Sequence, residues 1–226
     1  MLRLPLPFIF LILCLCVMPK MADAGSYKTQ NLKYNIQVDI PIGWELLPQN
    51  VLRQLGNMTE ALTGRDQSNN EILLAANCYT LNEKPSATVR ISVRKKASSV
   101  TQDELATFSD IDFKYILYEA INNAINLDKK LGTKTDIETL KVFTANVDGQ
   151  LAFVTAKNVL SHGKYQAHIF YLILMHDYRI KIYATFNWDE AMLFEPIIKR
   201  IISSIKIGTN HNQVKEIEDN IKAIRK

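Results

Sequence analysis

Cysteine is scarce in this sequence, and its scarcity limits how the protein is stabilised. Of the three cysteines among 226 residues, Cys14 and Cys16 lie in an apolar N-terminal stretch that we expect to be removed. Cys78 is then alone, so no internal disulfide forms and stability must come from a hydrophobic core. Cys78 itself lies in the apolar run "ILLAANCYT" (72–80), which is typical of a core thiol rather than an accessible nucleophile.

Motifs of common enzyme chemistry are also missing. The eight glycines are scattered and form no phosphate-binding loop, and no serine lies in a G-x-S-x-G motif. Paired carboxylates occur at Asp110–Asp112 and Asp189–Glu190. Each pair lies where a helix is expected to begin, so helix capping accounts for both. We therefore predict no catalytic residues and a non-enzymatic protein.

The four histidines do not predict a metal site. Six residues separate His162, in the expected turn "SHGK", from His168, in the expected strand 165–175, which is about 20 Å at about 3.3 Å per residue. His176 follows at the opposite turn, and zinc ligands must converge within about 2 Å of the ion. His211 lies in a polar tail. We therefore expect surface or rim histidines, no bound metal and no cofactor.

The excess of basic over acidic residues is small, which argues against a nucleic-acid-binding protein. Removal of the N-terminal stretch takes away Arg3, Lys20 and Asp23 and leaves 25 basic and 22 acidic residues, a net charge of +3. Nucleic-acid binding is expected of a clustered basic face. A second long apolar run is missing too, since "IFYLILM" (169–175) has only the length of a strand.

The first 24 residues have the features of a secretory signal peptide. Arg3 supplies a positive charge, "LPLPFIFLILCLCVM" is an apolar stretch of 15 residues, and "ADA" places small residues before a cleavage between Ala24 and Gly25. A membrane-spanning helix needs about 20 apolar residues, so an uncleaved anchor is the less favoured alternative. We expect a periplasmic or secreted protein that contacts membrane only at the surface or through an uncleaved leader.

Hydrophobic periodicity predicts an α+β fold, in which helices flank an antiparallel β-sheet. The expected strands are residues 34–40, 72–80, 87–96, 138–147, 150–160, 165–175 and 178–186. The expected helices are residues 50–63, 110–130, 187–204 and 213–225. The last four strands are joined by the short turns "VDGQ", "SHGK" and "HD", which force antiparallel neighbours.

Capping signals mark the start of several helices. Three pairs have the spacing of a capping box: Thr101 with Glu104, Ser109 with Asp112, and Asn187 with Glu190. After the last pair we expect an apolar stripe that packs on the sheet, made of Met192, Leu193, Ile197, Ile201 and Ile205.

The element order and several segments resemble the PsbP-like family of α/β/α sandwiches. The segments are "IQVDIPIGWELL" (36–47), the paired strands 72–80 and 87–96 with the long helix after them, the meander, and "NWDEAMLFEPIIKRIISSIKI" (187–207). This family includes thylakoid-lumen photosystem subunits, a Ran-binding eukaryotic family and bacterial envelope proteins of the DcrB type. The resemblance covers most of residues 31–207. It implies docking onto a partner or support of a larger assembly, and it carries over no functional residue.

We therefore predict a signal peptide (1–24), one PsbP-like domain (25–207) and a C-terminal amphipathic tail (208–226). The apolar positions 214, 217, 221 and 224 of the tail are expected to pack on the domain, with recruitment of a partner as the alternative. Trp44 follows the bend at "PIG" (41–43) and is expected to pack the first strands against a helix. The alternative for Trp44 is an exposed binding residue.

One basic strip is a candidate binding surface. Arg90, Arg94 and Lys96 alternate along the strand 87–96, on the face opposite its apolar residues, and Lys95 lies beside them. Such a strip suits an acidic partner protein, a phospholipid headgroup or a polyanion. Two simpler interpretations are a solvated strand face and a sheet edge whose charges prevent aggregation.

Taken together, these patterns predict an exported, non-enzymatic protein-binding or assembly domain of the bacterial cell envelope, whose partner is an envelope protein. The alternative is a periplasmic module that binds a small ligand or lipid between sheet and helices, in a gap lined by Phe153, Phe170, Tyr171 or Tyr183. The sequence leaves the oligomeric state open.

Overall fold

The computed structural model describes residues 26–63, 68–80, 84–95, 100–131, 136–161 and 163–208. The expected leader with its Ala24–Gly25 cleavage site, Lys96, His162 and the tail from residue 209 onward lie outside these ranges. No helix within the described ranges is long and apolar enough to cross a membrane.

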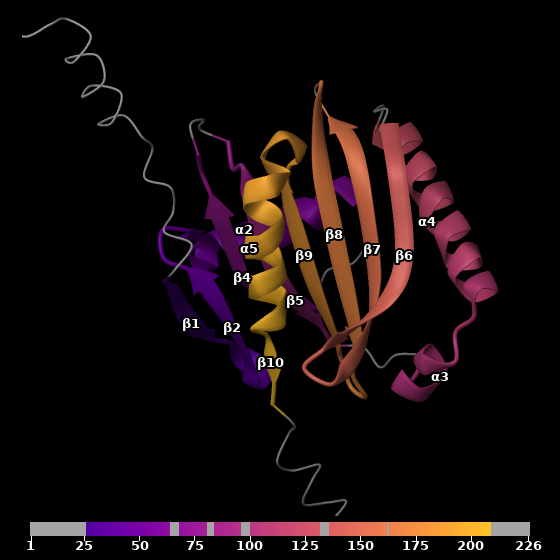
Figure 1. The fold of residues 1–226 in the computed structure, drawn as a ribbon, viewed down its shortest axis with the longest axis horizontal. Helices are drawn as coiled ribbons and strands as arrows, with labels where there is room; N and C mark the ends of the chain where they lie inside the picture. The colour runs from indigo at the N-terminus through magenta and orange to yellow at the C-terminus, as the bar shows by residue number, and fades with distance from the viewer. Residues whose placement is uncertain are drawn as a thin grey trace, which may run out of the picture.

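A seven-stranded antiparallel sheet forms the centre of the fold, with strand order β3-β4-β5-β9-β8-β7-β6. The strands are β3 (Glu45–Leu46), β4 (Asn70–Cys78), β5 (Ala87–Arg94), β6 (Asp136–Val147), β7 (Gln150–Ser161), β8 (Lys164–Leu174) and β9 (Arg179–Asn187). The meander of four long strands and the predicted fold class are confirmed. Figure 1 shows the sheet with one helix in front of it and another behind.

The front face, called the first face, is covered by a small sheet and one helix. The small sheet has the order β1-β2-β10, with β1 (Tyr27–Asn31), β2 (Ile36–Pro41) and β10 (Lys206–Ile207), and the helix is α5 (Ala191–Ser203). The prediction that a strand starts at Tyr34 is wrong, because Tyr34 and Asn35 have φ of 62° and 54° in the turn η1 (Lys33–Asn35). Strand β1 was not predicted, because its half-exposed residues "YKTQN" form no apolar alternation.

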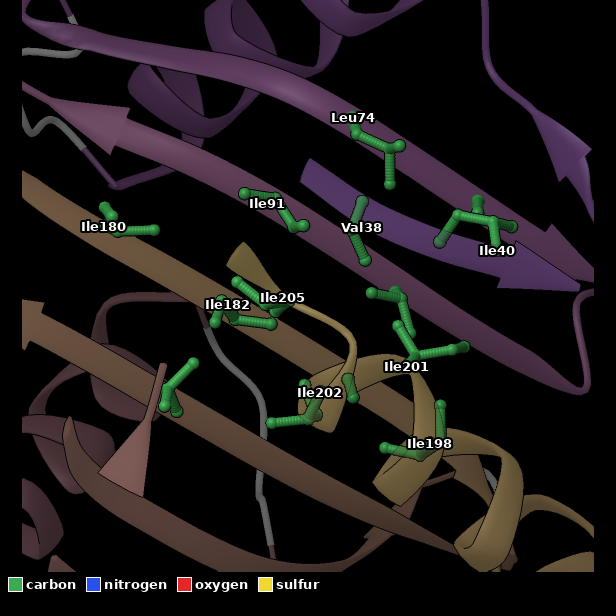
Figure 2. Packing of buried hydrophobic residues seen from close by; sticks show 14 of the residues in the cluster. Val38, Ile40, Leu74, Ile91, Ile180, Ile182, Ile198, Ile201, Ile202 and Ile205 are labelled. Carbon is green, nitrogen blue, oxygen red and sulfur yellow. The ribbon is translucent and has the colours of Figure 1, made fainter. Parts of the chain in front are cut away.

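The main hydrophobic core lies between the sheet and this first-face layer. Isoleucine and valine side chains of the sheet meet those of α5 and β2, as Figure 2 shows for Ile91, Ile182 and Ile201. Trp44 is buried, and its ring meets Phe194 of α5 edge-on with 6.4 Å between centroids, which confirms the structural role predicted for it. Cys78 is buried too, as predicted, and burial raises the pKa of its thiol.

The apolar stripe predicted for α5 is partly wrong. Met192 is 97% exposed, and Leu193 is exposed as well. Asn187 does not cap the helix, because its Nδ2 donates to Oε2 of Glu190 and the short turn η2 (Trp188–Glu190) precedes α5. The helix therefore starts later than predicted, and its buried side is made of Phe194, Ile197, Ile198, Ile201 and Ile202.

The opposite face of the large sheet, called the second face, carries the remaining helices. Leu52 of α2 (Gln49–Thr63) packs on Ile72 and Ala75 of β4. Phe113 of α4 (Asp110–Leu131) stacks on Phe153 of β7, with 6.2 Å between ring centroids. Between them along the chain is the short α3 (Gln102–Ala106).

Two capping boxes position α3 and α4, as predicted. The Thr101 hydroxyl accepts from the Glu104 amide while Glu104 accepts from the Thr101 amide, and the Ser109 amide likewise donates to Asp112 at 2.8 Å. The hydrogen bonds from Ser109 hold the pKa of the Asp112 carboxyl below its usual value. The side chain of Gln102 then joins α3 to the sheet, through Leu151 of β7 and Leu174 at the end of β8.

Removing the first cap should have a modest, measurable effect. We expect Thr101→Ala to lower the free energy of unfolding by about 1 kcal/mol, because the amide of Glu104 loses its acceptor. Glu104→Gln keeps an acceptor for the Thr101 amide, so the free energy of unfolding should fall by less than in Thr101→Ala. Urea denaturation followed by circular dichroism measures both values, and equal losses in the two variants would contradict the capping-box interpretation.

Candidate functional site

The register of four strands builds a hollow on the second face. Phe170 of β8 pairs with Tyr183 of β9 and with Thr155 of β7, and the next row along the strands pairs His168 with Lys157. Because side chains alternate across a strand, these residues all point to the same face. They line a cavity of about 250 Å³ that is partly open to solvent, and its full lining is Ile137, Leu140, Thr155, Lys157, His168, Phe170 and Tyr183.

His168 and Tyr183 form a hydrogen-bonded pair at this hollow. Burial, with a smaller contribution from the charge of Lys157, lowers the pKa of His168 to about 4, while burial raises the pKa of Tyr183 to about 12. Both groups are therefore neutral near pH 7. His168 Nδ1 contacts the Tyr183 hydroxyl, and we infer that the hydroxyl donates, so the ring proton lies on Nε2. Nε2 is buried and has no hydrogen-bond acceptor among the described residues.

Arg90 of β5 lies beside the same pair. It is directly opposite Tyr183 in the β5–β9 register and is half-buried. Burial lowers the pKa of its guanidinium, and the Tyr183 hydroxyl opposes this effect to a smaller extent. Its Nε is buried without an acceptor in the described structure, where Arg90 forms no ion pair. A buried donor without an acceptor costs about 1–3 kcal/mol, so Arg90 and His168 together leave donors that an added acceptor would stabilise.

The structure separates the residues of the predicted basic strip. Arg90 and Arg94 are half-buried on β5, an interior strand between β4 and β9, so the interpretation as a charged sheet edge is wrong. Neither side chain lies on a fully solvated face. Lys95 is exposed at a different hollow of about 660 Å³, which Lys33 and Glu71 also line. Lys96 lies outside the described residues, and docking of anions to the strip stays a prediction.

The hollow of about 660 Å³ at Lys95 contains an ion pair between Lys33 and Glu71. Lys33 Nζ lies 2.5 Å from a carboxylate oxygen of Glu71, and the hydrogen bond from Lys33 lowers the pKa of Glu71. Arg53 of α2 also lines this hollow. Because the pair is largely exposed, its net contribution to stability is small.

Three of the four aromatic residues predicted to line a ligand gap do share the second face. Phe170 and Tyr183 line the cavity, while Phe153 is stacked on Phe113 of α4. The prediction for Tyr171 is wrong: alternation along β8 turns it to the first face, where it packs on the main core. The pairing of His168 with Tyr183 was not predicted. The turn at His176–Asp177 sets the pairing of Phe170 with Tyr183, so the diagonal position of His168 was available from the sequence.

The histidine predictions have mixed outcomes. His168 is not a surface or rim residue, because its ring is half-buried in the middle of the sheet. His176 is exposed and lies 3.6 Å from Asp177. In the part of the chain that the structure describes, no three histidine, cysteine or acidic side chains are placed to hold one metal ion. His162 and His211 lie outside that part.

The lowered pKa of His168 predicts a loss of stability in acid. The ordinary pKa of histidine, about 6.5, applies to the unfolded chain, whereas the folded value is about 4. The unfolded chain therefore binds more protons between these values, so this contribution to stability is complete above pH 6.5 and is lost as the pH falls to 4. We expect a loss of about 1–2 kcal/mol, less than the full shift implies, because solvent screens the half-buried ring.

The control for this prediction is His168→Gln, which does not titrate. Urea denaturation at pH 7 and at pH 4 gives the acid loss for each protein. Carboxyl groups contribute equally to both and cancel in the difference. Equal acid losses in wild type and variant would show that His168 is not buried as described.

Comparisons with known proteins match only solved structures. Neither a family model nor a curated protein sequence matches the chain. Cyanobacterial PsbP (CyanoP) from Synechocystis is 12% identical, with a TM-score of 0.49, covering 81% of this chain and 92% of that one. LpqN, involved in cell envelope biogenesis of Mycobacterium tuberculosis, is 12% identical with a TM-score of 0.45, covering 81% and 91%.

A third match is the Ran-binding protein Mog1p of Saccharomyces cerevisiae, 8% identical with a TM-score of 0.41, covering 80% of this chain and 95% of that one. The first match belongs to the PsbP-like group that the sequence resembles. These likenesses concern the fold alone.

Proposed function

We propose that this protein is an exported, non-enzymatic module that binds a small molecule in the hollow of the second face. The observation that carries the proposal is the cavity of about 250 Å³, beside which His168 and Arg90 keep buried donors without acceptors. The signal-peptide features of residues 1–24 support export. A cavity of this size is below the usual range for drug-sized ligands, so the ligand is small.

The titration of the pair supports binding rather than catalysis. A general acid or base works best with a pKa near the working pH. His168 at about 4 and Tyr183 at about 12 are both far from neutrality. The neutral pair is thus better suited to hold a ligand by hydrogen bonds than to transfer protons.

Filling the hollow tests this function. The full chain is expressed, and the product is examined by native mass spectrometry, as purified and after incubation with an extract of small metabolites. We expect a bound molecule in the wild type and in Lys141→Trp, which adds a ring at an exposed site on β6. Thr155→Trp, which fills the cavity, should bind none. Equal retention of ligand by both variants, or no ligand in any protein, would overturn the proposal.

A second candidate function, binding of an envelope protein, is favoured by the outer side of α4. Phe113 and Ile116 turn toward the sheet, whereas a row of large apolar side chains at helical spacing is exposed. The row comprises Ile111, Tyr115, Tyr118 and Ile125, of which Tyr115 is 66% and Tyr118 is 62% exposed. Exposed aromatic residues are typical of protein interfaces.

Negative charge introduced into the apolar row of α4 separates the two candidate functions. We expect an envelope protein captured by the wild type to be lost from the double variant Tyr115→Glu/Tyr118→Glu and kept by Lys114→Glu, an exposed control on the same helix. Ligand retention in the cavity should be unaffected. Capture that is equal in all three proteins would exclude this surface.

A further inference from the structure

The lining of the cavity divides into an apolar side and a basic side. Ile137, Leu140 and Phe170 supply the apolar wall, from β6 and β8. Lys157 of β7 lines the other side, near enough to His168 for its charge to lower the pKa of the ring. No aspartate or glutamate is among the described residues that line the cavity.

Arg90, next to the basic side, has no counter-charge among the described residues. Arg90 is half-buried opposite Tyr183, and burial rather than any acidic neighbour dominates the shift of its pKa. A half-buried cation without an anion is costly, because burial removes solvation that no partner replaces. An anion at this place would compensate for the solvation that Arg90 has lost. It would also accept hydrogen bonds from the buried Nε of Arg90 and from Nε2–H of His168.

The two sides together restrict the ligand. A neutral hydrocarbon would suit the wall of Ile137, Leu140 and Phe170 but would leave the donors unsatisfied. A fully hydrated inorganic anion would suit the donors but would leave the apolar wall against water. Only a molecule that combines one anionic group with a short apolar body satisfies both sides.

We propose that the ligand of this cavity is a small organic monoanion, a carboxylate with a short aliphatic or aromatic body. Its carboxylate lies beside Arg90, His168 and Lys157, and its body lies on the wall of Ile137, Leu140 and Phe170. This assignment rests on the proposed small-molecule function and specifies the class of ligand.

Matched probes test the charge of the ligand on the wild-type protein. Octanoate, 1-octanol and octylamine have the same chain length and differ in the head group, and inorganic phosphate supplies an anion without an apolar body. Isothermal titration of the full-chain product should give octanoate an affinity about tenfold or more above that of the other three. Octanol or octylamine binding as tightly as octanoate would overturn the monoanion and leave the small-molecule function standing. If no probe binds and no molecule is retained in native mass spectrometry, both proposals fail.

Variants then test the residues. Arg90→Met removes the charge and keeps an apolar stem, and it should weaken octanoate binding about tenfold while leaving octanol binding unchanged. Arg53→Met, at the separate hollow of α2, is the control and should bind octanoate like the wild type. If Arg90→Met does not fold, Lys157→Met serves instead, since its half-buried side chain lines the cavity directly. Unchanged octanoate affinity in a folded Arg90→Met or Lys157→Met protein would contradict the placement of the carboxylate.

Discussion

Replacing Phe194 with alanine is expected to remove about 3–5 kcal/mol from the free energy of unfolding. Phe194 is 1% exposed, and its ring meets the buried ring of Trp44 in an edge-on contact. The substitution leaves a cavity between α5 and the sheet, and the surrounding isoleucines fill it only in part. A loss of this size is a large fraction of the stability of an ordinary domain. Denaturation in urea, with circular dichroism as the signal, measures it.

Met192 provides the matched control on the same helix. It is 97% exposed, so Met192→Ala should change stability by less than about 0.5 kcal/mol. A double-mutant cycle of Phe194→Ala with Trp44→Leu should give a coupling energy of about 0.5–1.5 kcal/mol from the aromatic contact. Equal losses for Phe194→Ala and Met192→Ala would mean that α5 does not turn Phe194 toward the sheet and Met192 toward solvent.

The second large effect is expected at Gln102, which fastens α3 to the sheet. Its Nε2 donates to the carbonyl oxygens of Leu151 and Leu174 at 3.0 and 2.9 Å, and its Oε1 accepts from the Leu151 amide at 2.7 Å. Gln102→Ala removes all three bonds and leaves part-buried backbone groups without partners. We expect a loss of about 2–4 kcal/mol in the free energy of unfolding.

Asp103→Ala is the control for Gln102, because Asp103 is the exposed neighbour in the same turn. It should cost well under 1 kcal/mol, through the helix dipole alone. Hydrogen exchange adds a local reading: the amide of Leu151 should lose protection in Gln102→Ala and keep it in Asp103→Ala. Protection that survives in Gln102→Ala would show that α3 is held by other contacts.

The sequence predicts the sheet better than it predicts the site, for a physical reason. Short turns force neighbouring strands to pair antiparallel, so the meander from β6 to β9 follows from "VDGQ", "SHGK" and "HD" alone. Capping boxes are similarly local, and those at Thr101 and Ser109 are confirmed. The stripe of α5 was misplaced because it depends on where the helix begins, which the turn η2 delays.

The candidate site depends on contacts between distant segments, which single-strand patterns do not contain. In the sequence, Arg90 is one of several charged residues on an alternating strand. Its burial becomes evident only when β5 is known to lie between β4 and β9. The sequence places His168 in a strand, but only the strand register shows that it contacts Tyr183. Burial by the neighbouring strands then lowers the pKa of His168 and raises that of Tyr183, and no local sequence pattern indicates that burial.

The pairing of β2 with β10 has a consequence for biogenesis. Gln37 and Ile36 are bonded in register to Lys206 and Ile207, so the first-face layer joins segments from opposite ends of the chain. Before β10 has left the ribosome, β2 lacks one of its two partner strands and the layer is incomplete. The first-face layer is therefore completed only after Ile207 has left the ribosome, whatever the earlier strands have formed by then.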